Sequence, residues 1–346
     1  RSKRGEINLR FVSLGEIMGR LSTIDYEKIV NSKKFDINYG GAEANVAVTL
    51  ANLGVEVSSF ISALPENTLG DSIIKYLRSN NVEVKHIIRN EGRLGLYFVE
   101  TGFSLRNSSV IYDRKNSVIA EANSDDFDFD EILKNYDWFH ISGITPAISK
   151  KAKALTLKAL VSAKKLGLKV SLDLNYREKL WEFQEARDVL SELVKFADVC
   201  IGIEPLNLLD DNGKDKKEGL SRDNPSIDEM HCIFKEIERV YGPKIIARTV
   251  RKSISSNRNA LKGFLYKDGK TIETNWEEFD ILDRVGGGDS FAAGLIYALD
   301  KFEEAEKIIE FALASSVLKH AIRGDAGIFS HQDVEKYLKE GMDIKR

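Results

Sequence analysis

Three glycines and an aspartate stand in a row before an apolar helical pattern, in the stretch ILDRVGGGDSFAAGLIYAL at residues 281–299. Successive glycines let the backbone approach a ligand closely, and the first amides of the predicted helix should point outward as an anion site. A carboxylate there would repel a simple anion, but it can accept a proton from a hydroxyl that attacks a phosphate. The stretch therefore favours phosphoryl transfer, with the amides of Gly286–Gly288 as an anion hole and Asp289 as the base.

The same stretch also has a purely structural interpretation. An aspartate after a glycine turn is a common N-cap, so the residues alone leave both interpretations open. The chain contains no P-loop pattern G-x-x-x-x-G-K-[ST], and the stretch fails G-x-G-x-x-G because Phe291 stands at the last glycine position.

Composition excludes several other classes of protein. The 346 residues are 30% charged with a net charge of −3, which gives no electrostatic basis for nucleic acid or an anionic membrane as the main partner. No apolar run reaches the roughly 18 residues of a membrane helix. Cys200 and Cys232 form no disulfide framework or zinc spacing, so a cytoplasmic location is expected. The five histidines are scattered, and we expect them to be structural or surface residues.

Short β-rich runs alternate with helical patterns along the chain. The predicted strands begin at Phe11, Val57, Asp137, Lys169, Asp198 and Lys244. Apolar spacing predicts helices within 42–54 and 148–167, each ended by a glycine. The alternation predicts one α/β domain over residues 1–346, with a mostly parallel central sheet covered by helices on both faces.

Two segments depart from this alternation. Residues 93–121 read as consecutive strands and turns without a helix, and with part of about 16–40 they are predicted to form a small antiparallel sheet. Such a sheet exposes one face unless it covers a site or pairs with a copy of itself. We therefore expect it to act as a lid and to form a homodimer or higher oligomer. The polar, aperiodic residues 209–228 predict an exposed loop.

The sequence also resembles a known family. DRVGGGD is similar to the D-T-x-G-A-G-D signature of the ribokinase-like (PfkB) carbohydrate kinases, with Arg284 in place of the usual Thr and Gly287 in place of the usual Ala. The resemblance runs from GEIMGRLS to HAIRGDAGIFS. Within the family, GGAEANVAVTLANLG, VIYDR and SLDLNYREKLW are most similar to the subgroup that acts on 2-keto-3-deoxygluconate. The resemblance implies a three-layer α/β fold with Asp289 as the catalytic base.

A second glycine pair opens the first predicted helix, in YGGAEANVAV. Gly40 and Gly41 allow close backbone approach, and Asn45 offers a donor and an acceptor to sugar hydroxyls. Alternatively, these residues form a turn and Asn45 satisfies the backbone. The family resemblance implies a sugar-binding role for them, and for Asp325 in RGDAG, which could instead belong to a tight turn.

Two arginines indicate the kind of sugar. Arg114 lies in VIYDR at the expected tip of the strand-rich segment, and Arg177 follows a predicted strand in DLNYREKLW. A guanidinium pair binds a carboxylate through charge-assisted hydrogen bonds. With Tyr97 and Tyr112, the pair resembles the acid-sugar pocket of the subgroup, although Arg177 could instead contact ATP phosphates.

The expected reaction is therefore ATP-dependent phosphorylation of the primary (C6) hydroxyl of 2-keto-3-deoxygluconate. The alternatives are a kinase for a neutral sugar such as fructose and a non-catalytic sugar- or nucleotide-binding protein on the same scaffold. Arginines that read a substrate carboxylate separate the first two, and an intact base argues against the third.

The nucleotide end carries weaker signals. The chemistry implies ATP with Mg²⁺, and the family leaves room for a monovalent cation. Glu204 is the candidate metal ligand, although Ile203 stands where an Asn is expected, and Asn175 could contact water or phosphate beside Asp173.

The segment ARTVRKSISSNRNALKG replaces the K-x-G-x-x-G element of many relatives. Its Thr249, Arg251 and Ser253 are candidates for phosphate or ribose contacts, or they form a polar turn after a strand. The adenine is expected between this segment and the small residues 314–316.

Overall fold

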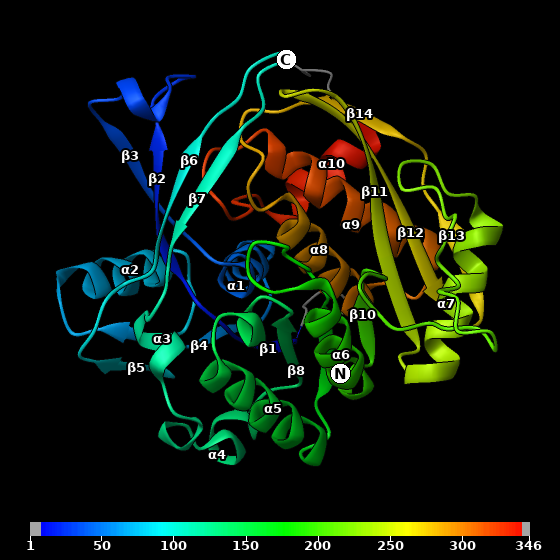
Figure 1. Cartoon of the computed structure of the whole chain (residues 1–346), viewed down its shortest axis with the longest axis horizontal. Helices are drawn as coiled ribbons and strands as arrows, with labels where there is room; N and C mark the ends of the chain where they lie inside the picture. The colour runs from blue at the N-terminus through cyan, green and yellow to red at the C-terminus, as the bar shows by residue number, and fades with distance from the viewer. Residues whose placement is uncertain (1–7, 341–346) are drawn as a thin grey trace.

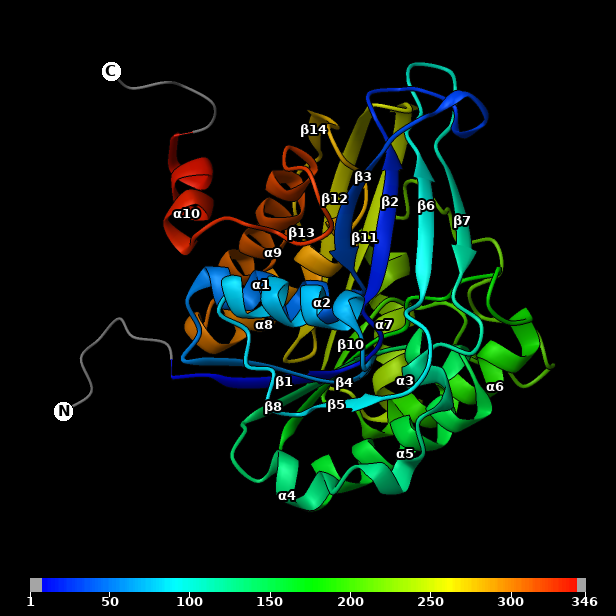
Figure 2. The same ribbon diagram turned by 90° about the vertical axis from the view of Figure 1, so that its left-hand side faces the viewer.

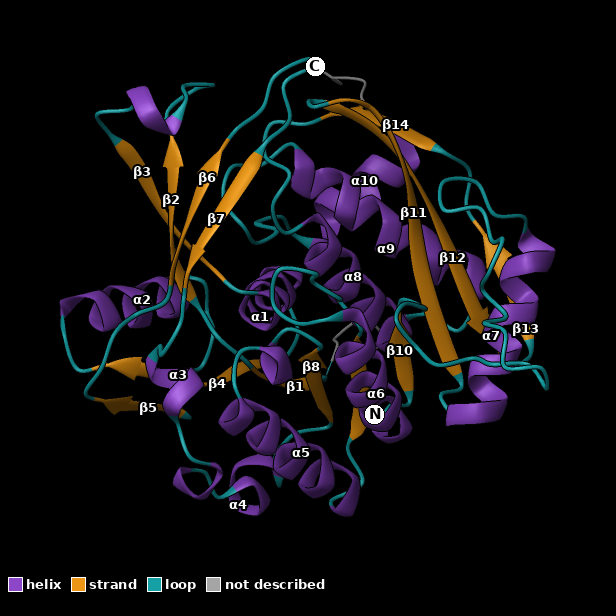
Figure 3. Cartoon of the chain, viewed as in Figure 1, coloured by secondary structure: helices purple, strands orange, loops and turns teal. Residues whose placement is uncertain are grey.

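The computed structural model describes residues 8–340, so the predicted domain of residues 1–346 extends beyond the described part at both ends. The main sheet has the strands β1 (Arg10–Leu14), β4 (Val57–Pro65), β5 (Ile87–Asn90), β8 (Trp138–Ser142), β9 (Lys169–Asp173), β10 (Val199–Ile201), β11 (Ile245–Ser255), β12 (Arg258–Lys267), β13 (Lys270–Glu273) and β14 (Glu277–Asp280). Their order is β13-β12-β11-β10-β9-β8-β1-β4-β5, with β14 also paired to β12 (Figures 1 and 3).

The seven neighbouring strands β11, β10, β9, β8, β1, β4 and β5 pair in parallel. At one edge of the sheet, β12 pairs antiparallel with β11, β13 and β14. Each of the six predicted strands is present. Parallel strands need apolar side chains on both faces. In β1, Phe11 packs into one hydrophobic core and its neighbour Val12 into the other. The prediction of a mostly parallel α/β sheet is therefore confirmed.

Helices cover both faces of this sheet. They are α1 (Ala42–Leu53), α2 (Thr68–Ser79), α3 (Val118–Glu121), α4 (Phe129–Leu133), α5 (Lys150–Lys165), α6 (Phe183–Leu193), α7 (Ile227–Tyr241), α8 (Gly287–Lys301), α9 (Ala305–His320) and α10 (His331–Glu340). Residues of α1, α2, α8 and α9 share one core with the sheet, and residues of α3 to α7 share the other. Figure 2 shows these two layers above and below β1, β4 and β8.

A small second sheet stands apart from the main one (Figure 1). It consists of β2 (Met18–Thr23), β3 (Phe35–Gly40), β6 (Leu96–Glu100) and β7 (Ser109–Asp113), in the order β3-β2-β6-β7. The predicted segments do form a sheet, but the expectation that it is antiparallel is wrong for β2 and β6, which pair in parallel. Residues 93–121 were predicted to contain no helix, but their last four residues form the short helix α3.

The predicted exposed loop at 209–228 is only partly exposed. The ammonium of Lys217 is buried and donates to the carbonyl oxygen of Leu206. Arg222 and Asp223 line the cavity described below, and α7 begins at Ile227. The composition of this segment is that of a loop, but its contacts hold it against the body of the protein.

No helix within residues 8–340 has the length and apolar character that a membrane crossing requires.

Candidate active site

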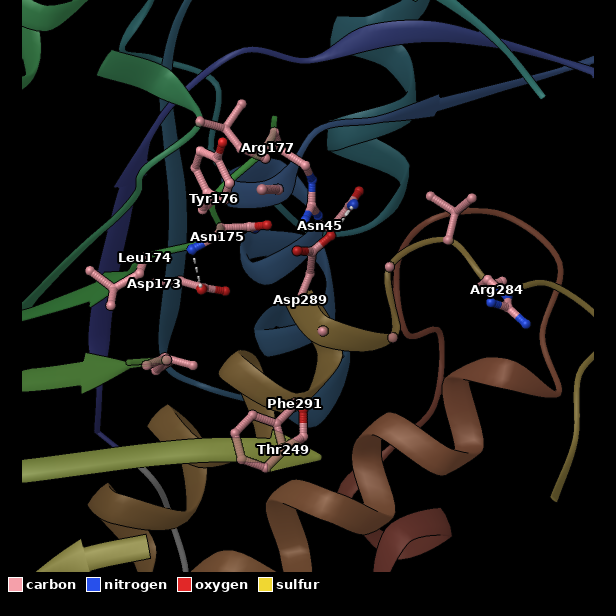
Figure 4. Close-up of a pocket in the computed structure, with 18 of the residues that line it drawn as sticks. Asn45, Asp173, Leu174, Asn175, Tyr176, Arg177, Thr249, Arg284, Asp289 and Phe291 are labelled. Carbon is pink, nitrogen blue, oxygen red and sulfur yellow. Dashed lines mark hydrogen bonds between the residues drawn. The ribbon is translucent and has the colours of Figure 1, made fainter. Parts of the chain in front are cut away.

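A cavity of about 810 Å³ opens between the small sheet and the carboxyl ends of the parallel strands. Ligands of α/β proteins bind at this edge, and the volume is that of a small-molecule site. Figure 4 shows part of its wall. The predicted site residues that line it are Gly40, Gly41, Asn45, Tyr97, Tyr112, Arg114, Asn175, Arg177, Glu204, Thr249, Arg251, Gly286, Gly287, Gly288, Asp289 and Asp325.

The glycine turn gives α8 an unobstructed N-terminus in the cavity wall. Gly286 is the N-cap, with a left-handed φ of 82°, and a Cβ there would collide with the carbonyl oxygen of Asp325. Only glycine accommodates both constraints. The first amides of α8 are without intrahelical partners and carry the positive end of the helix dipole, so the turn can hold an anion.

Asp289 lies in the first turn of α8, and the N-cap of the helix is Gly286 instead. The N-cap interpretation of Asp289 is therefore wrong. Its Oδ2 instead accepts a hydrogen bond from Asn45 Nδ2 at 2.7 Å (Figure 4). Burial raises the pKa of Asp289 to about 6, against the lowering effects of this hydrogen bond and of Arg177. The carboxylate is suited to accept a proton near neutral pH.

Asn45 has two partners. Besides donating to Asp289, its Oδ1 accepts from the backbone amide of Gly41 at 3.3 Å. The residue thus satisfies the backbone, as one interpretation has it, and also orients the carboxylate, which the sequence did not indicate.

A second carboxylate, Asp173, ends β9 and lies to the left of Asp289 in the view of Figure 4. It accepts from the backbone amide of Asn175 at 3.0 Å. Burial raises the pKa of Asp173 to about 7, the charge of Asp289 adds to the shift, and Arg177 opposes it. The cavity therefore contains two carboxyl groups that titrate near neutral pH.

Arg114 does not lie at the tip of the small sheet. It follows β7 at the base, since Asp113 pairs with Leu96, the first residue of β6. Arg114 Nε donates to Glu16 Oε2 at 2.7 Å, and Glu16 Oε1 accepts from Ser117 Oγ at 2.5 Å. Arg114 and Glu16 are buried. A carboxylate that the sequence did not reveal therefore already balances the charge of Arg114, which was predicted to bind the substrate carboxylate.

Arg177 is exposed at the cavity wall, four residues after β9. Its charge lowers the pKa of both Asp173 and Asp289. A cation near the base is thus accessible to an anionic substrate group.

Asp325 belongs to a buried ionic network instead of a simple turn. Its carboxylate accepts from the Tyr97 hydroxyl and from Arg20 Nη1, the latter at 2.8 Å. Arg20 Nη2 also pairs with Asp283 at 2.9 Å. The ring of Tyr112 lies 6.0 Å from that of Tyr97 and extends the wall toward solvent. Asp325 thus holds the base of the small sheet against the glycine turn.

Thr249 and Arg251 line the cavity from strand β11. This strand continues to Ser255 and stays paired with β12, with Ser253 opposite Asn259. The alternative of a polar turn at these residues is therefore wrong, and Ser253 is not among the residues found to line the cavity.

Three further arginines that were not predicted as site residues line the cavity. Arg222, Arg248 and Arg284 line the cavity together with Arg251. Burial lowers the pKa of Arg248 and of Arg284, and Arg251 adds to the shift of Arg284. Four guanidinium groups around one cavity complement a polyphosphate. Arg222, Arg248 and Arg284 come from three separate segments, so no single motif marks them as a group.

His320, predicted to be a structural or surface residue, is buried beside the glycine turn. It lines the cavity at the C-terminus of α9, and a Cβ on Gly287 would collide with its ring. Burial lowers the pKa of His320 to about 4, so the ring is neutral near pH 7. Ser316 lies beside it and donates to the carbonyl oxygen of Gly287 at 2.8 Å. Of the predicted adenine-side residues 314–316, Ser316 is the one that the cavity includes.

Glu204 lies on the cavity wall with its carboxylate 3.6 Å from Lys217 Nζ. Burial raises the pKa of Glu204. Within residues 8–340, no group of three or more His, Cys, Asp or Glu side chains could hold a metal ion by itself. Any metal here would need ligands from a bound phosphate or water.

Comparisons with known proteins agree with this geometry. Residues 8–204 match the family described as pfkB family carbohydrate kinase. The chain is 30% identical to a 2-dehydro-3-deoxygalactonokinase of Haloferax volcanii, over 95% of this chain and 96% of that protein. It is 29% identical to a 5-dehydro-2-deoxygluconokinase of Clostridium perfringens, over 89% and 86%.

Among solved structures, a 2-dehydro-3-deoxygluconokinase from Thermotoga maritima is 40% identical. It superposes with a TM-score of 0.88, covering 95% of this chain and 98% of that one. The similarity thus includes both walls of the cavity.

Proposed function

This chain belongs to the pfkB family of carbohydrate kinases, and we propose that it transfers the γ-phosphoryl group of ATP to the C6 hydroxyl of 2-keto-3-deoxygluconate. The product is 2-keto-3-deoxy-6-phosphogluconate. The observation that carries this proposal is the buried carboxylate of Asp289 at the start of α8, in one cavity with the exposed guanidinium of Arg177. The relatives named after dehydro-deoxy sugar acids support the same substrate class.

In the proposed mechanism, Asp289 accepts the proton of the C6 hydroxyl as its oxygen attacks the γ-phosphorus. The bond from that phosphorus to the bridging oxygen of ADP breaks, and its electron pair leaves with ADP. The amides at the start of α8 stabilise the charge of the phosphoryl group in transit. Asn45 keeps the carboxylate aimed at the hydroxyl.

Arg177 is the residue that we assign to the substrate carboxylate. Arg177 is close enough to Asp289 for its charge to lower the pKa of that carboxyl, and Arg222, Arg248 and Arg251 also line the cavity. The ATP phosphates have these three arginines and the glycine turn to bind, so Arg177 is left for the sugar acid. Gly40, Gly41, Tyr97 and Tyr112 form the rest of the proposed sugar pocket, with Thr249 on the nucleotide side.

Mg²⁺ would shield the phosphate charge when bound with ATP. Asp173 and Glu204 supply carboxylate oxygens on the cavity wall, which are the donors that Mg²⁺ prefers, and Asn175 lies next to Asp173. We therefore place the metal near these two carboxylates, bound mainly through phosphate and water.

One observation favours a neutral-sugar kinase, such as a fructokinase, as the second candidate. Arg114 is neutralised by Glu16, so one of the two predicted carboxylate-binding arginines is already occupied. A single exposed arginine is a weaker argument for an acid substrate than a pair.

We further infer that the small sheet acts as a lid and as the interface of a homodimer. The strand register aligns Ile37, Leu21, Phe98 and Ile111 in one row across β3, β2, β6 and β7. Ile37 and Ile111 are 65% and 54% exposed. Two such rows could cover each other.

We place the enzyme in the cytoplasm, since it uses ATP and since Cys200 and Cys232 are free thiols.

The deciding experiment measures ADP release with Mg-ATP and a panel of 2-keto-3-deoxygluconate, its galactose-series epimer, gluconate, fructose and ribose. Turnover confined to the keto-deoxy acids is the expected result, and phosphorus NMR of the product identifies the C6 ester. Turnover with fructose or ribose would overturn the acid assignment and leave Asp289 as the base of a neutral-sugar kinase.

A further inference from the structure

A lysine ammonium is buried directly behind the glycine turn. Lys319, in the last turn of α9, is 0% exposed. Lysine is almost never fully buried without a compensating partner. Its Nζ donates to the carbonyl oxygen of Ile322 at 3.1 Å and, over a longer 3.5 Å, to that of Asp283. The ammonium is therefore solvated by main-chain carbonyls, as a bound cation would be.

These two carbonyls belong to the segments that support the anion hole. Asp283 precedes the turn, and its carboxylate accepts from the amides of Val285 and Gly324. Gly286 in turn packs against the carbonyl of Asp325. Lys319 thus ties residues 283–286 to residues 322–325, and the separation of these segments sets the position of the first α8 amides.

The ammonium also balances a buried charge. Arg20 pairs with Asp283 and Asp325, so these three side chains together carry one net negative charge. The carboxylates of Asp283 and Asp325 raise the pKa of Lys319, although burial lowers it more. With a protonated Lys319, the cluster behind the turn is electrically neutral, and no further cation is needed there.

We propose that Lys319 is a positioning residue that serves as a built-in monovalent cation, holding the anion hole in shape so that phosphoryl transfer needs no dissolved alkali-metal ion. Ammonium and K⁺ are similar in size, and both bind carbonyl oxygens. The monovalent cation suggested by family resemblance therefore does not fit at these carbonyls, because the chain supplies its own. The inference rests on the kinase activity but not on which sugar is the substrate.

The first test varies the cation around the unmodified enzyme. At constant ionic strength, replacing choline with Li⁺, Na⁺ or K⁺ should change kcat by less than about twofold, a difference too small for a lost charged contact. A kcat that rises several-fold with K⁺ and not with Li⁺ would overturn the proposal by itself.

The second test removes the ammonium. Lys319→Ala should lower kcat by about tenfold or more, the scale of a lost charged hydrogen bond, and K⁺ or methylammonium should restore most of it. Lys307→Ala is the matched control, because Lys307 lies on the exposed side of the same helix. This variant should keep full activity, and its kcat should not change when K⁺ or methylammonium is added. A folded Lys319→Ala enzyme with unchanged kcat, or one that no small cation rescues, contradicts the built-in cation.

A thermal readout is independent of substrate. The Tm of ligand-free Lys319→Ala should rise with K⁺ or methylammonium relative to choline, while the unmodified protein shows no such difference. A cation-specific rise in the unmodified protein would overturn the proposal. If no sugar in the panel is turned over, the proposed function fails, while this thermal comparison still decides on Lys319. If the variant does not fold, the measurements on the unmodified enzyme decide.

Discussion

Asn45 Nδ2 donates to Asp289 Oδ2 at 2.7 Å, and this hydrogen bond joins the first turns of α1 and α8 across 244 positions of sequence. Both helices begin at a glycine N-cap, Gly41 for α1 and Gly286 for α8. The glycine pair of the proposed sugar side and the glycine turn of the phosphate side therefore meet at one carboxylate. The proposed transfer would need a sugar hydroxyl and a phosphate to come together at this carboxylate.

We expect Asp289→Asn to lower kcat by about 10²- to 10⁴-fold, the usual contribution of a general base. The amide is nearly isosteric but cannot accept the hydroxyl proton. Calorimetry should show that the sugar still binds, because the substituted side chain keeps the shape of the cavity. Near-normal kcat in the variant would exclude Asp289 as the base.

The acid limb of the pH–rate profile should follow Asp289. Its pKa is raised to about 6 by burial, so kcat/KM should fall as pH drops through about 6 and the base becomes protonated. Asn45→Ala removes a hydrogen bond that favours the charged carboxylate, so the limb should move to higher pH. Asn52→Ala in the same helix, where the amide bonds to the carbonyl of Val48, is the control that should leave the limb in place. If the acid limb of Asn45→Ala stays at the same pH, the limb does not report the ionisation of Asp289.

The ionised carboxylate of Asp173 should lower the free energy of unfolding at high pH. Its folded pKa of about 7 lies above the ordinary 3.8, so the native state binds a proton more tightly than the unfolded chain. Stability linked to this group is complete below about pH 4 and is lost as pH rises through about 7. The Tm of Asp173→Asn should therefore exceed that of the unmodified protein at pH 8, and the difference should shrink toward pH 4. Equal differences at both pH values would refute this account of Asp173.

The two predicted carboxylate-binding arginines should respond differently to removal. Arg177→Ala should raise KM for a sugar acid by about tenfold or more, the value of a charge-assisted contact, without a marked change in Tm. Arg114→Ala leaves Glu16 buried and unpaired, and breaking such a pair costs about 3–5 kcal/mol of stability. Steady-state kinetics and thermal melts on both variants test this. An unchanged KM in Arg177→Ala would return that residue to a phosphate or surface role.

The oligomeric state should depend on the outer row of the small sheet. Size-exclusion chromatography with light scattering should find a dimer at micromolar concentration, and Ile37→Lys with Ile111→Lys should give monomers, because each introduces a charge into an apolar interface. Leu157→Lys, an exposed apolar position on α5, controls for a general effect of added charge. A monomer before any substitution would reject the interface.

Short-range signals in the sequence were enough to predict several parts of this protein. Alternating strands and helices predicted the parallel sheet, and the glycine turn before α8 located Asp289. These features are local, because backbone freedom, helix periodicity and the N-terminal dipole are set within a few residues.

Which charged side chains lack a buried partner could be learned only from the folded structure. Arg114 pairs with Glu16 and Arg20 with Asp325, at separations of 98 and 305 residues. Nothing local distinguishes these buried pairs from the exposed Arg177. Strand register and the meeting of helix ends determine each partner, and a buried charge requires a partner that an exposed one does not. For the same reason, the sequence did not indicate a role for Lys319. The carbonyl oxygens that it contacts come together only where α9 ends behind the glycine turn.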